Sequence, residues 1–257
     1  MSAITPQGSA YRGESVQLDL PVLEPGTVTA VSAPAGVEAA LVLLAGDIEI
    51  AGTRAVRTDV FDAPATAVYL PPGSSIEVAA HSRTELALAS TVGAELHAPA
   101  GAAPVIVAPA DVVIHDRGRS GWQRQVHDIV AATVPAQRLL VGETFNAAGE
   151  WSSYPPHKHD GGDGEPALEE VYYYRFDRPD GFGFQGLYEL GEAASEGAVF
   201  LRHGSVVGIP RGYHPVCAAP GYRLYYLWAL GPRAGTARAL ALHEDPAHMW
   251  LHERPLD

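Results

Sequence analysis

The sequence predicts an all-β protein in which one chain forms two small β-barrels. Most segments alternate polar and apolar residues, or remain apolar for about four to eight residues, before Gly, Pro or Asp interrupts them. Such runs are typical of short antiparallel strands, and segments with a helical period are scarce. A length of 257 residues with 47% hydrophobic residues is enough for two packed cores.

The expected strands fall into two groups along the chain. In the first half we expect strands at residues 39–46, 47–52, 66–72, 75–80, 85–91 and 104–109. In the second half we expect them at residues 138–145, 169–176, 182–190, 205–212 and 222–231. Between the groups, residues 114–137 begin with charged residues and glycines typical of a linker, and residues 123–132 could form a short helix.

We place the boundary between the two halves near Ile114, which gives domains of residues 1–114 and 115–257. Each domain then has the size and strand content of a small jelly-roll barrel. The division is therefore part of the fold prediction.

Two segments of the chain weakly repeat each other. Residues 68–82 and 207–221 each combine a strand, a proline-glycine turn and a second strand. The first copy has Ser75 where the second has His214, and the first half contains no close pair of histidines. We therefore expect a degenerate first barrel without metal ligands and look for function in the second.

The charge of the chain narrows the class of partner. A net charge of −13 and a pI near 5.2 exclude nucleic acid or an anionic membrane as the main partner, because both require clustered Lys and Arg. No secretion signal or membrane-spanning run is apparent, so we expect a cytoplasmic protein. The single cysteine, Cys217, lies among small and apolar residues and is expected to be a buried packing residue rather than a nucleophile.

A cluster of potential metal ligands stands out in the second half. His157 and His159 are two residues apart, so on a strand their side chains point the same way, about 6.5–7 Å apart at Cα. A loop rich in glycine and acids follows, and the returning strand begins with Glu169 and Glu170. Strand alternation places Glu170 on the face of the aromatic row after it, so we expect it to face inward. Glu169, on the other face, and Glu165, in the loop, are the alternatives.

A fourth ligand is expected from the second copy of the repeat. A strand ends at Pro210, and a turn at Gly212 aims His214 back toward the interior. Three neutral imidazoles and one carboxylate suit Zn²⁺ first, with Mn²⁺ or Fe²⁺ as alternatives, and leave a position for water or substrate. We expect the other histidines of the second half at the surface or as capping groups: His115, His127, His203, His243, His248 and His252.

The order of these residues resembles the two cupin motifs, which place three histidines and a glutamate around a metal in a jelly roll. The matching residues are His157, His159, Glu170, Gly204, Pro210, Gly212 and His214. The segments "WSSYPPHKHD", "LEEVYYYRF", "GFGFQ", "PRGYHPV" and "PGYRLYYLWALGP" also resemble the 5-deoxy-glucuronate isomerases of inositol breakdown, a family of two-cupin enzymes. The resemblance covers most of residues 142–250. It implies a bicupin that converts 5-deoxy-glucuronate to 2-deoxy-5-keto-gluconate through an enediol.

An isomerase of this kind needs a proton carrier and a cation for the sugar acid. Tyr172 and Tyr174 share the face of the expected glutamate ligand and are the candidate catalytic residues, with packing inside the barrel as the alternative for both. Arg211, beside the histidine turn, is the first choice for the substrate carboxylate, because arginine can bind it with two hydrogen bonds. Gln185 could bind a sugar hydroxyl.

Two other functions remain open from the sequence. The same ligand set on a cupin also suits an iron-dependent dioxygenase, which would consume oxygen. A bicupin that binds sugar without catalysis is the third hypothesis. The expected partner in each case is a small molecule, with neither nucleic acid nor membrane, and the sequence leaves a homo-oligomer open.

Overall fold

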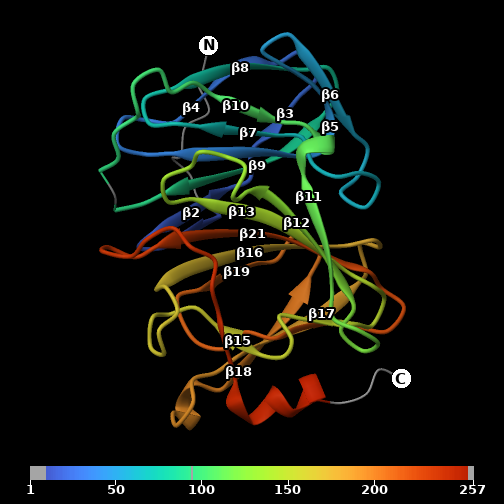
Figure 1. The fold of residues 1–257 in the computed structure, drawn as a ribbon. Coiled ribbons are helices and arrows are strands. Elements are labelled where there is room, and N and C mark those ends of the chain that lie inside the picture. Colours follow the sequence, from blue (N-terminus) through green and yellow to red (C-terminus); the bar gives the residue numbers. More distant parts are fainter. Residues whose placement is uncertain (1–9, 94, 254–257) are drawn as a thin grey trace.

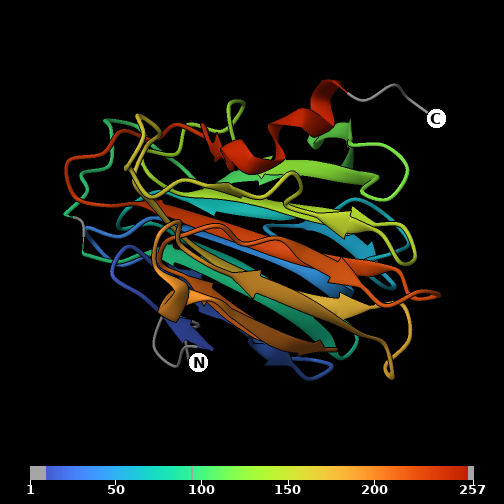
Figure 2. The ribbon, with the colours of Figure 1, turned by 90° about the horizontal axis from the view of Figure 1, so that it is seen from below.

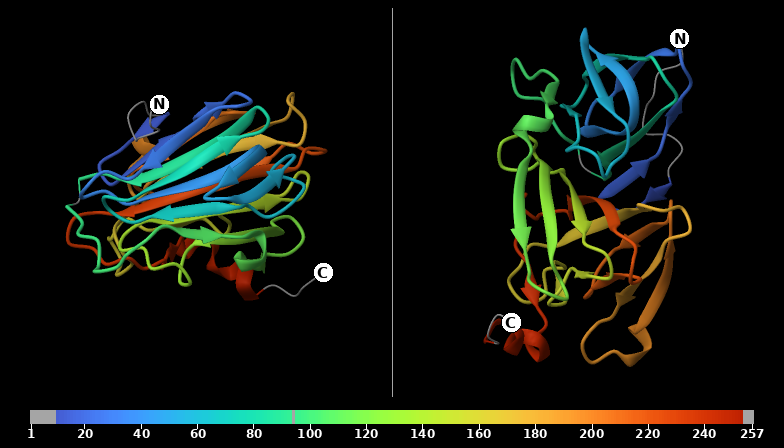
Figure 3. Two further views of the ribbon diagram at one scale, coloured as in Figure 1. Left: turned by 90° about the horizontal axis from the view of Figure 1, so that it is seen from above. Right: turned by 90° about the vertical axis from the view of Figure 1, so that its right-hand side faces the viewer.

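A computed structural model describes residues 10–93 and 95–253. It confirms the all-β prediction, since the helical segments of these residues are three 3₁₀ stretches: η1 (Pro109–Asp111), η2 (Ala193–Ser195) and η3 (Pro246–Glu253). The two halves are stacked, the first above the second in Figure 1, and the right-hand view of Figure 3 separates them. No helix within the described ranges has the length and hydropathy needed to cross a membrane.

The first half forms one branched antiparallel sheet. Its path is β1-β2-β9-β5-β7-β10, with β3 on β9, β6 and β8 on β5, and β4 on β8. Its strands are β1 (Tyr11–Arg12), β2 (Val16–Asp19), β3 (Val22–Leu23), β4 (Val28–Ser32), β5 (Ala39–Ile50), β6 (Thr53–Arg57), β7 (Ala67–Leu70), β8 (Ser75–Ala80), β9 (Thr84–Thr91) and β10 (Val105–Val107).

The second half folds into three sheets. Their strand orders are β11-β12-β13-β21-β16-β19, β14-β20-β17-β18 and β15-β22. Their strands are β11 (Val113–Arg117), β12 (Arg124–Val130), β13 (Leu140–Asn146), β14 (Trp151–Ser152), β15 (His157–Lys158), β16 (Leu168–Phe176), β17 (Phe182–Leu187), β18 (Gly197–Arg202), β19 (Val206–Ile209), β20 (Val216–Ala218), β21 (Leu224–Pro232) and β22 (His243–Glu244).

Strands β16 and β21 are buried on both faces because each serves two cores. Tyr172 and Tyr174 of β16 belong to the core of the second barrel, whereas Val171 and Tyr173 belong to a core that also contains residues of the first half. The two halves therefore pack sheet on sheet, with strands running in similar directions in Figure 2. Burial on both faces accounts for the long apolar and aromatic runs of these two strands.

A fully buried ion pair joins the two halves. Arg57 of β6 donates from Nη1 and Nη2 to the two carboxylate oxygens of Glu143 on β13, at 2.7 and 3.0 Å. Tyr225 donates to the same carboxylate at 2.8 Å. A buried charge pair of this kind is costly to break, because removing one partner leaves the other unpaired.

The prediction of a linker with a short helix at residues 114–137 is wrong. This segment contributes β11 and β12, which form an antiparallel hairpin, and β12 pairs in turn with β13. The expected break between residues 39–46 and 47–52 is also wrong, because β5 continues through both. Gly46, at φ +131°, lets the strand bend without ending it.

The division into two domains stays a proposal, and sheet pairing bears on where it lies. Strands up to Val107 pair with one another, and β11 pairs with the second half from Val113 onward. We therefore propose that the boundary lies at η1, slightly before Ile114. Residues 1–9, 94 and 254–257 of the two predicted domains lie outside the described residues.

Candidate metal centre

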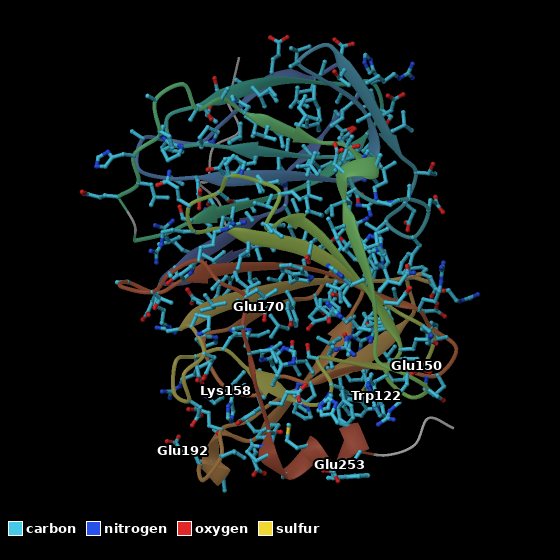
Figure 4. The ribbon with its side chains drawn as sticks, in the orientation of Figure 1. Trp122, Glu150, Lys158, Glu170, Glu192 and Glu253 are labelled. Atoms are coloured by element: carbon cyan, nitrogen blue, oxygen red, sulfur yellow. The ribbon has the colours of Figure 1, made fainter. Side chains whose placement is uncertain are left out.

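Strand β16 supplies the carboxylate of the site. Glu170 lies on the same face as Tyr172 and Tyr174, toward the interior of the second barrel. Its backbone pairs with Leu230 of β21 on one side and with Ile209 of β19 on the other. The side chain is only 4% exposed, and Figure 4 shows it within the lower barrel.

Two irregular segments bring the histidines to this carboxylate. His157 lies in the short strand β15, and His159 follows it, tied to the start of β16 because its backbone oxygen accepts a 2.7 Å bond from the Leu168 N–H. His214 comes from the turn between β19 and β20. Gly212 in that turn has φ +86°, a conformation that glycine adopts without strain.

His159, Glu170 and His214 converge. Nε2 of His159 lies 3.0 Å from Oε2 of Glu170, and Nε2 of His214 lies 3.4 Å from the same oxygen. Nδ1 of His159 faces the Leu168 oxygen at 3.3 Å, and Nδ1 of His214 faces the Gly212 oxygen at 2.9 Å. A carbonyl oxygen only accepts, so both rings donate from Nδ1 and direct Nε2 toward Glu170.

This donor set fits a cation. Two ring nitrogens and a carboxylate oxygen face one another in a buried space, and Nε2 of His214 has no hydrogen-bond partner among the described residues. Acceptors arranged in this way repel unless a positive charge lies between them. Ligand atoms that are each about 2.1 Å from one ion stand about 3–3.5 Å apart, which matches both contacts to Glu170.

His157 lies beside this group. Its ring centre is 4.8 Å from that of His214 and 6.3 Å from that of His159, and its side chain lines the same cavity. Three of the four predicted ligands are thus in mutual contact, and the fourth is their neighbour.

The electrostatics of the site favour neutral rings at His157 and His214. Burial lowers the pKa of His157 well below its usual range and lowers the pKa of His214 to about 4. Burial acts on His159 in the same direction, but the hydrogen bond with Glu170 outweighs it and raises the pKa. The neutral ring is the form that binds a metal, so His157 and His214 are already in the ligand form at neutral pH.

The two alternative glutamates are engaged elsewhere. Glu169 faces the first half, where Oε1 accepts from the Tyr11 hydroxyl at 2.9 Å and Oε2 from the Ser15 N–H at 2.6 Å. Glu165 accepts from Nζ of Lys158 at 2.5 Å. Lys158, labelled in Figure 4, already provides the cation of that acidic loop.

The two candidate tyrosines have different surroundings. Tyr172 lines the cavity, with its ring centre 6.0 Å from that of His214 and its hydroxyl 3.2 Å from Oγ of Ser153. Tyr174 donates to Oε1 of Gln185 at 2.6 Å, and neither residue of this buried pair lines the cavity. Burial raises the pKa of Tyr172 well above 10, so its hydroxyl stays protonated and can donate.

Arg211 lies outside the cavity. Its side chain is 64% exposed, its Nε is 3.0 Å from Oε1 of Glu189, and it lines a separate surface hollow. The turn at Gly212 reverses the chain between Arg211 and His214, so that one side chain points outward and the other inward. Arg211, the residue expected to bind the substrate carboxylate, is thus not among the residues that line the cavity.

The cavity in front of the ligands has a volume of about 380 Å³, and the sequence prediction missed one of its walls. The hairpin β11–β12 contributes Arg117 and Arg124. It also contributes His115, expected at the surface, whose Nε2 lies 3.1 Å from Oδ2 of Asp128. Cross-strand pairing of Arg117 with Arg124 would have been the signal, had this segment been assigned to strands.

Comparison with known proteins places this chain in a family. The model of the KduI/IolB family matches residues 1–251. A protein of Geobacillus kaustophilus (strain HTA426) named 5-deoxy-glucuronate isomerase is 39% identical over 228 residues, which cover 85% of this chain and 79% of the relative. The protein of the same name from Bacillus subtilis (strain 168) is 37% identical over 202 residues, covering 77% and 71% of the two chains.

Solved structures agree with this placement. An IolB-like protein from Salmonella typhimurium LT2 superposes with a TM-score of 0.82 at 32% identity, covering 93% of this chain and 90% of that one. The oxalate decarboxylase of Lactobacillus farciminis, in a formate complex, superposes with a TM-score of 0.63 at 13% identity over 95% and 82% of the chains. The latter likeness concerns the fold alone and confirms the predicted bicupin. With a family model that matches nearly its whole length, the chain belongs to the KduI/IolB family.

Proposed function

We propose that this protein is a metal-dependent aldose–ketose isomerase that converts 5-deoxy-glucuronate to 2-deoxy-5-keto-gluconate in the cytoplasmic breakdown of myo-inositol. The name shared by the relatives supports the reaction. The observation that carries the metal dependence is the convergence of His159, Glu170 and His214 on one buried point. The substrate is then a small sugar acid.

We assign the metal to His157, His159, Glu170 and His214. A divalent ion bound there would act as a Lewis acid that polarises the substrate carbonyl and stabilises developing negative charge. Zn²⁺ suits three imidazoles and one carboxylate, and Mn²⁺ or Fe²⁺ would fit the same donors. The backbone carbonyls that accept from Nδ1 orient the rings of His159 and His214 for this role.

The reaction also requires that a proton leave one carbon and return to its neighbour. Tyr172 stays protonated, so we assign it a hydrogen bond to a substrate oxygen rather than the role of base. Apart from the proposed ligands, the described residues that line the cavity include one imidazole–carboxylate pair, His115 with Asp128. We assign proton transfer to His115, with Asp128 orienting its ring.

An isotope experiment tests the reaction. Metal-loaded protein incubated anaerobically with 5-deoxy-glucuronate in D₂O should give the keto acid with deuterium at the former aldehyde carbon. Transfer through an exchanging base requires that label, whereas internal hydride transfer retains the original hydrogen. Chelator should abolish turnover and added divalent metal should restore it. Absence of turnover, with oxygen uptake on another substrate, would favour a dioxygenase instead.

A further inference from the structure

Arg124, the less exposed of the two arginines that line the cavity, forms no ion pair among the described residues. Arg124 begins β12 and pairs with Arg117 of β11 and with Asn146 of β13, on the face that lines the cavity. Its guanidinium donates from Nη1 to the backbone oxygen of Trp122 at 3.2 Å. No carboxylate among the described residues lies within 4 Å of it. Its remaining N–H groups have no hydrogen-bond partner among the described residues.

The two arginines that are buried among the described residues, Arg57 and Arg175, each have a carboxylate partner. Arg57 is held by Glu143, and Arg175 donates to Glu85 at 2.6 Å. Burial lowers the pKa of Arg124, and the Glu244 carboxylate, which is not close enough to form an ion pair, does not offset this effect. A guanidinium remains charged at neutral pH, and a half-buried charge without a partner is costly. An anion supplied by a ligand would remove that cost.

The entrance to the cavity is also lined by positively charged residues. Arg117 is exposed, and together with Arg124 it lines both the cavity and an adjoining hollow that contains Trp122 and Tyr154. The rings of Trp122 and Tyr154 are 5.5 Å apart, and Figure 4 shows Trp122 at the right-hand side of the second barrel. The lining of this hollow has three arginines, Arg117, Arg119 and Arg124, against one carboxylate, Glu244. In a chain with a net charge of −13 it is a local positive region that would attract a small anion.

We propose that Arg124 binds the carboxylate of the sugar acid, with Arg117 at the entrance to attract it. The inference rests on the proposed function, because it takes the substrate to be a sugar acid. Arginine can bind a carboxylate through two parallel hydrogen bonds, which fixes both position and orientation. Arg124 lines the same cavity as His157, His159 and Glu170, so the anion subsite and the proposed ligands belong to one cavity. The aldehyde end of the substrate then faces the ligands.

Kinetics with an acid and a neutral substrate test this assignment. Arg124→Ala should raise KM for 5-deoxy-glucuronate by roughly 10- to 100-fold and leave kcat largely unchanged, because a remote carboxylate is bound equally in the ground and transition states. For 5-deoxy-glucose, which has a hydroxymethyl group in place of the carboxylate, the variant and the wild type should have the same KM. Arg124→Lys should be intermediate, since it keeps the charge without the paired donors. Arg211→Ala is the matched control and should leave both KM values unchanged.

Two further measurements separate this inference from the reaction itself. Metal content per chain should be the same in wild type and Arg124→Ala. Calorimetry should detect binding of gluconate, but not of sorbitol, to the wild type and no binding of either to Arg124→Ala. If the wild type binds gluconate through Arg124 but does not isomerise 5-deoxy-glucuronate, the anion subsite stands and the proposed reaction fails. An equal KM change for acid and neutral substrate, unaltered kinetics, or a larger effect of Arg117→Ala would overturn the assignment to Arg124.

Discussion

The two barrels share a frame but differ in the residues that face their interiors. The repeated strand-proline-turn segments align Leu70 of β7 with Ile209 of β19. Leu70 pairs with Ala39 of β5, and Ile209 pairs with Glu170 of β16. The first barrel thus has an alanine where the second has its buried glutamate.

The next inward row continues the difference. Leu41 pairs with Leu88 in the first half, and the equivalent pair in the second half is Tyr172 with Trp228. The first interior is filled by aliphatic side chains, whereas the second has an aromatic wall that borders a cavity. A packing barrel and a binding barrel can therefore differ at a few inward positions without any change of fold.

On the opposite face, toward the other half, the two halves have the same type of residue at the equivalent position. Glu38 precedes Ala39 as Glu169 precedes Glu170, and each carboxylate reaches into the other half. Glu38 accepts from the backbone N–H groups of Arg138 at 2.6 Å and Leu139 at 2.5 Å. Glu169 accepts from Ser15 at 2.6 Å. Two equivalent glutamates, one from each half, thus form hydrogen bonds across the interface.

We call these two glutamates, Glu38 and Glu169, the interface anchors. Each also accepts a hydrogen bond from a tyrosine, but the two tyrosines come from non-equivalent strands. Tyr69 of β7 donates to Glu38 at 2.8 Å. The equivalent position on β19 is Gly208, and the ring of Tyr11 from the first half occupies the space above it, where a Cβ would lie 2.0 Å from the ring. Tyr11 then donates to Glu169 at 2.9 Å. The anchor is retained although its tyrosine comes from another strand.

The largest expected effect is at the inward glutamate. Glu170→Gln should weaken metal retention by at least about 10- to 100-fold and abolish activity, because the amide replaces a charged oxygen that two histidines face. Glu169→Gln should retain the metal. Elemental analysis after dialysis, with one ion per wild-type chain expected, measures both. If Glu169→Gln lost the metal and Glu170→Gln retained it, the ligand would be Glu169 and the proposed assignment would be wrong.

The hairpin β11–β12 gives the second expected effect. Strand β2 of the first half occupies the position that β13 has in the second half. Beside β2 lies only the two-residue strand β1, where β13 has the hairpin β11–β12, so the first barrel lacks this wall. His115→Ala should lower kcat by about 10²- to 10⁴-fold while the metal stays bound, since it removes the proposed proton carrier. Metal content and kcat measured on the same preparation test this. Unchanged kcat would remove His115 from the mechanism.

The paired anchors give a smaller effect, on stability. Glu38→Gln and Glu169→Gln should each lower the free energy of unfolding by roughly 1–3 kcal/mol, because each leaves buried N–H groups without a charged acceptor. Denaturant unfolding, with metal content as the control, compares them. A marked loss for one variant and none for the other would contradict the equivalence of the two anchors.

Strand alternation and turn residues were enough to predict much of this fold and part of the site from the sequence. Alternation along residues 169–176 already separates Glu170 from Glu169, and the structure has them on opposite faces. The hairpin β11–β12 was not predicted because its cavity-facing residues are charged. A strand with such residues has the same composition as a polar linker. Arg211 is next to the histidine turn in sequence but lies outside the cavity, because the chain reverses at Gly212, which has a positive φ.

The smallest expected effect lies at the interface, where the second half contributes an unpaired titratable group. His127 of β12 is buried, and neither ring nitrogen has a hydrogen-bond partner among the described residues. It packs on Phe145, near the Arg57–Glu143 pair and Asp128.

Burial lowers the pKa of His127, so below the usual histidine pKa of about 6.5 the unfolded chain binds a proton that the folded chain does not. The stability that depends on a neutral His127 is therefore present above about pH 6.5 and is lost as the pH falls, by at most about 1.4 kcal/mol per pH unit. His127→Leu should reduce this loss between pH 7 and pH 5. Urea unfolding of both proteins in chelator isolates the difference, because the other histidines are common to both. Parallel pH profiles would show that His127 does not contribute to acid sensitivity and that the interface accommodates its proton.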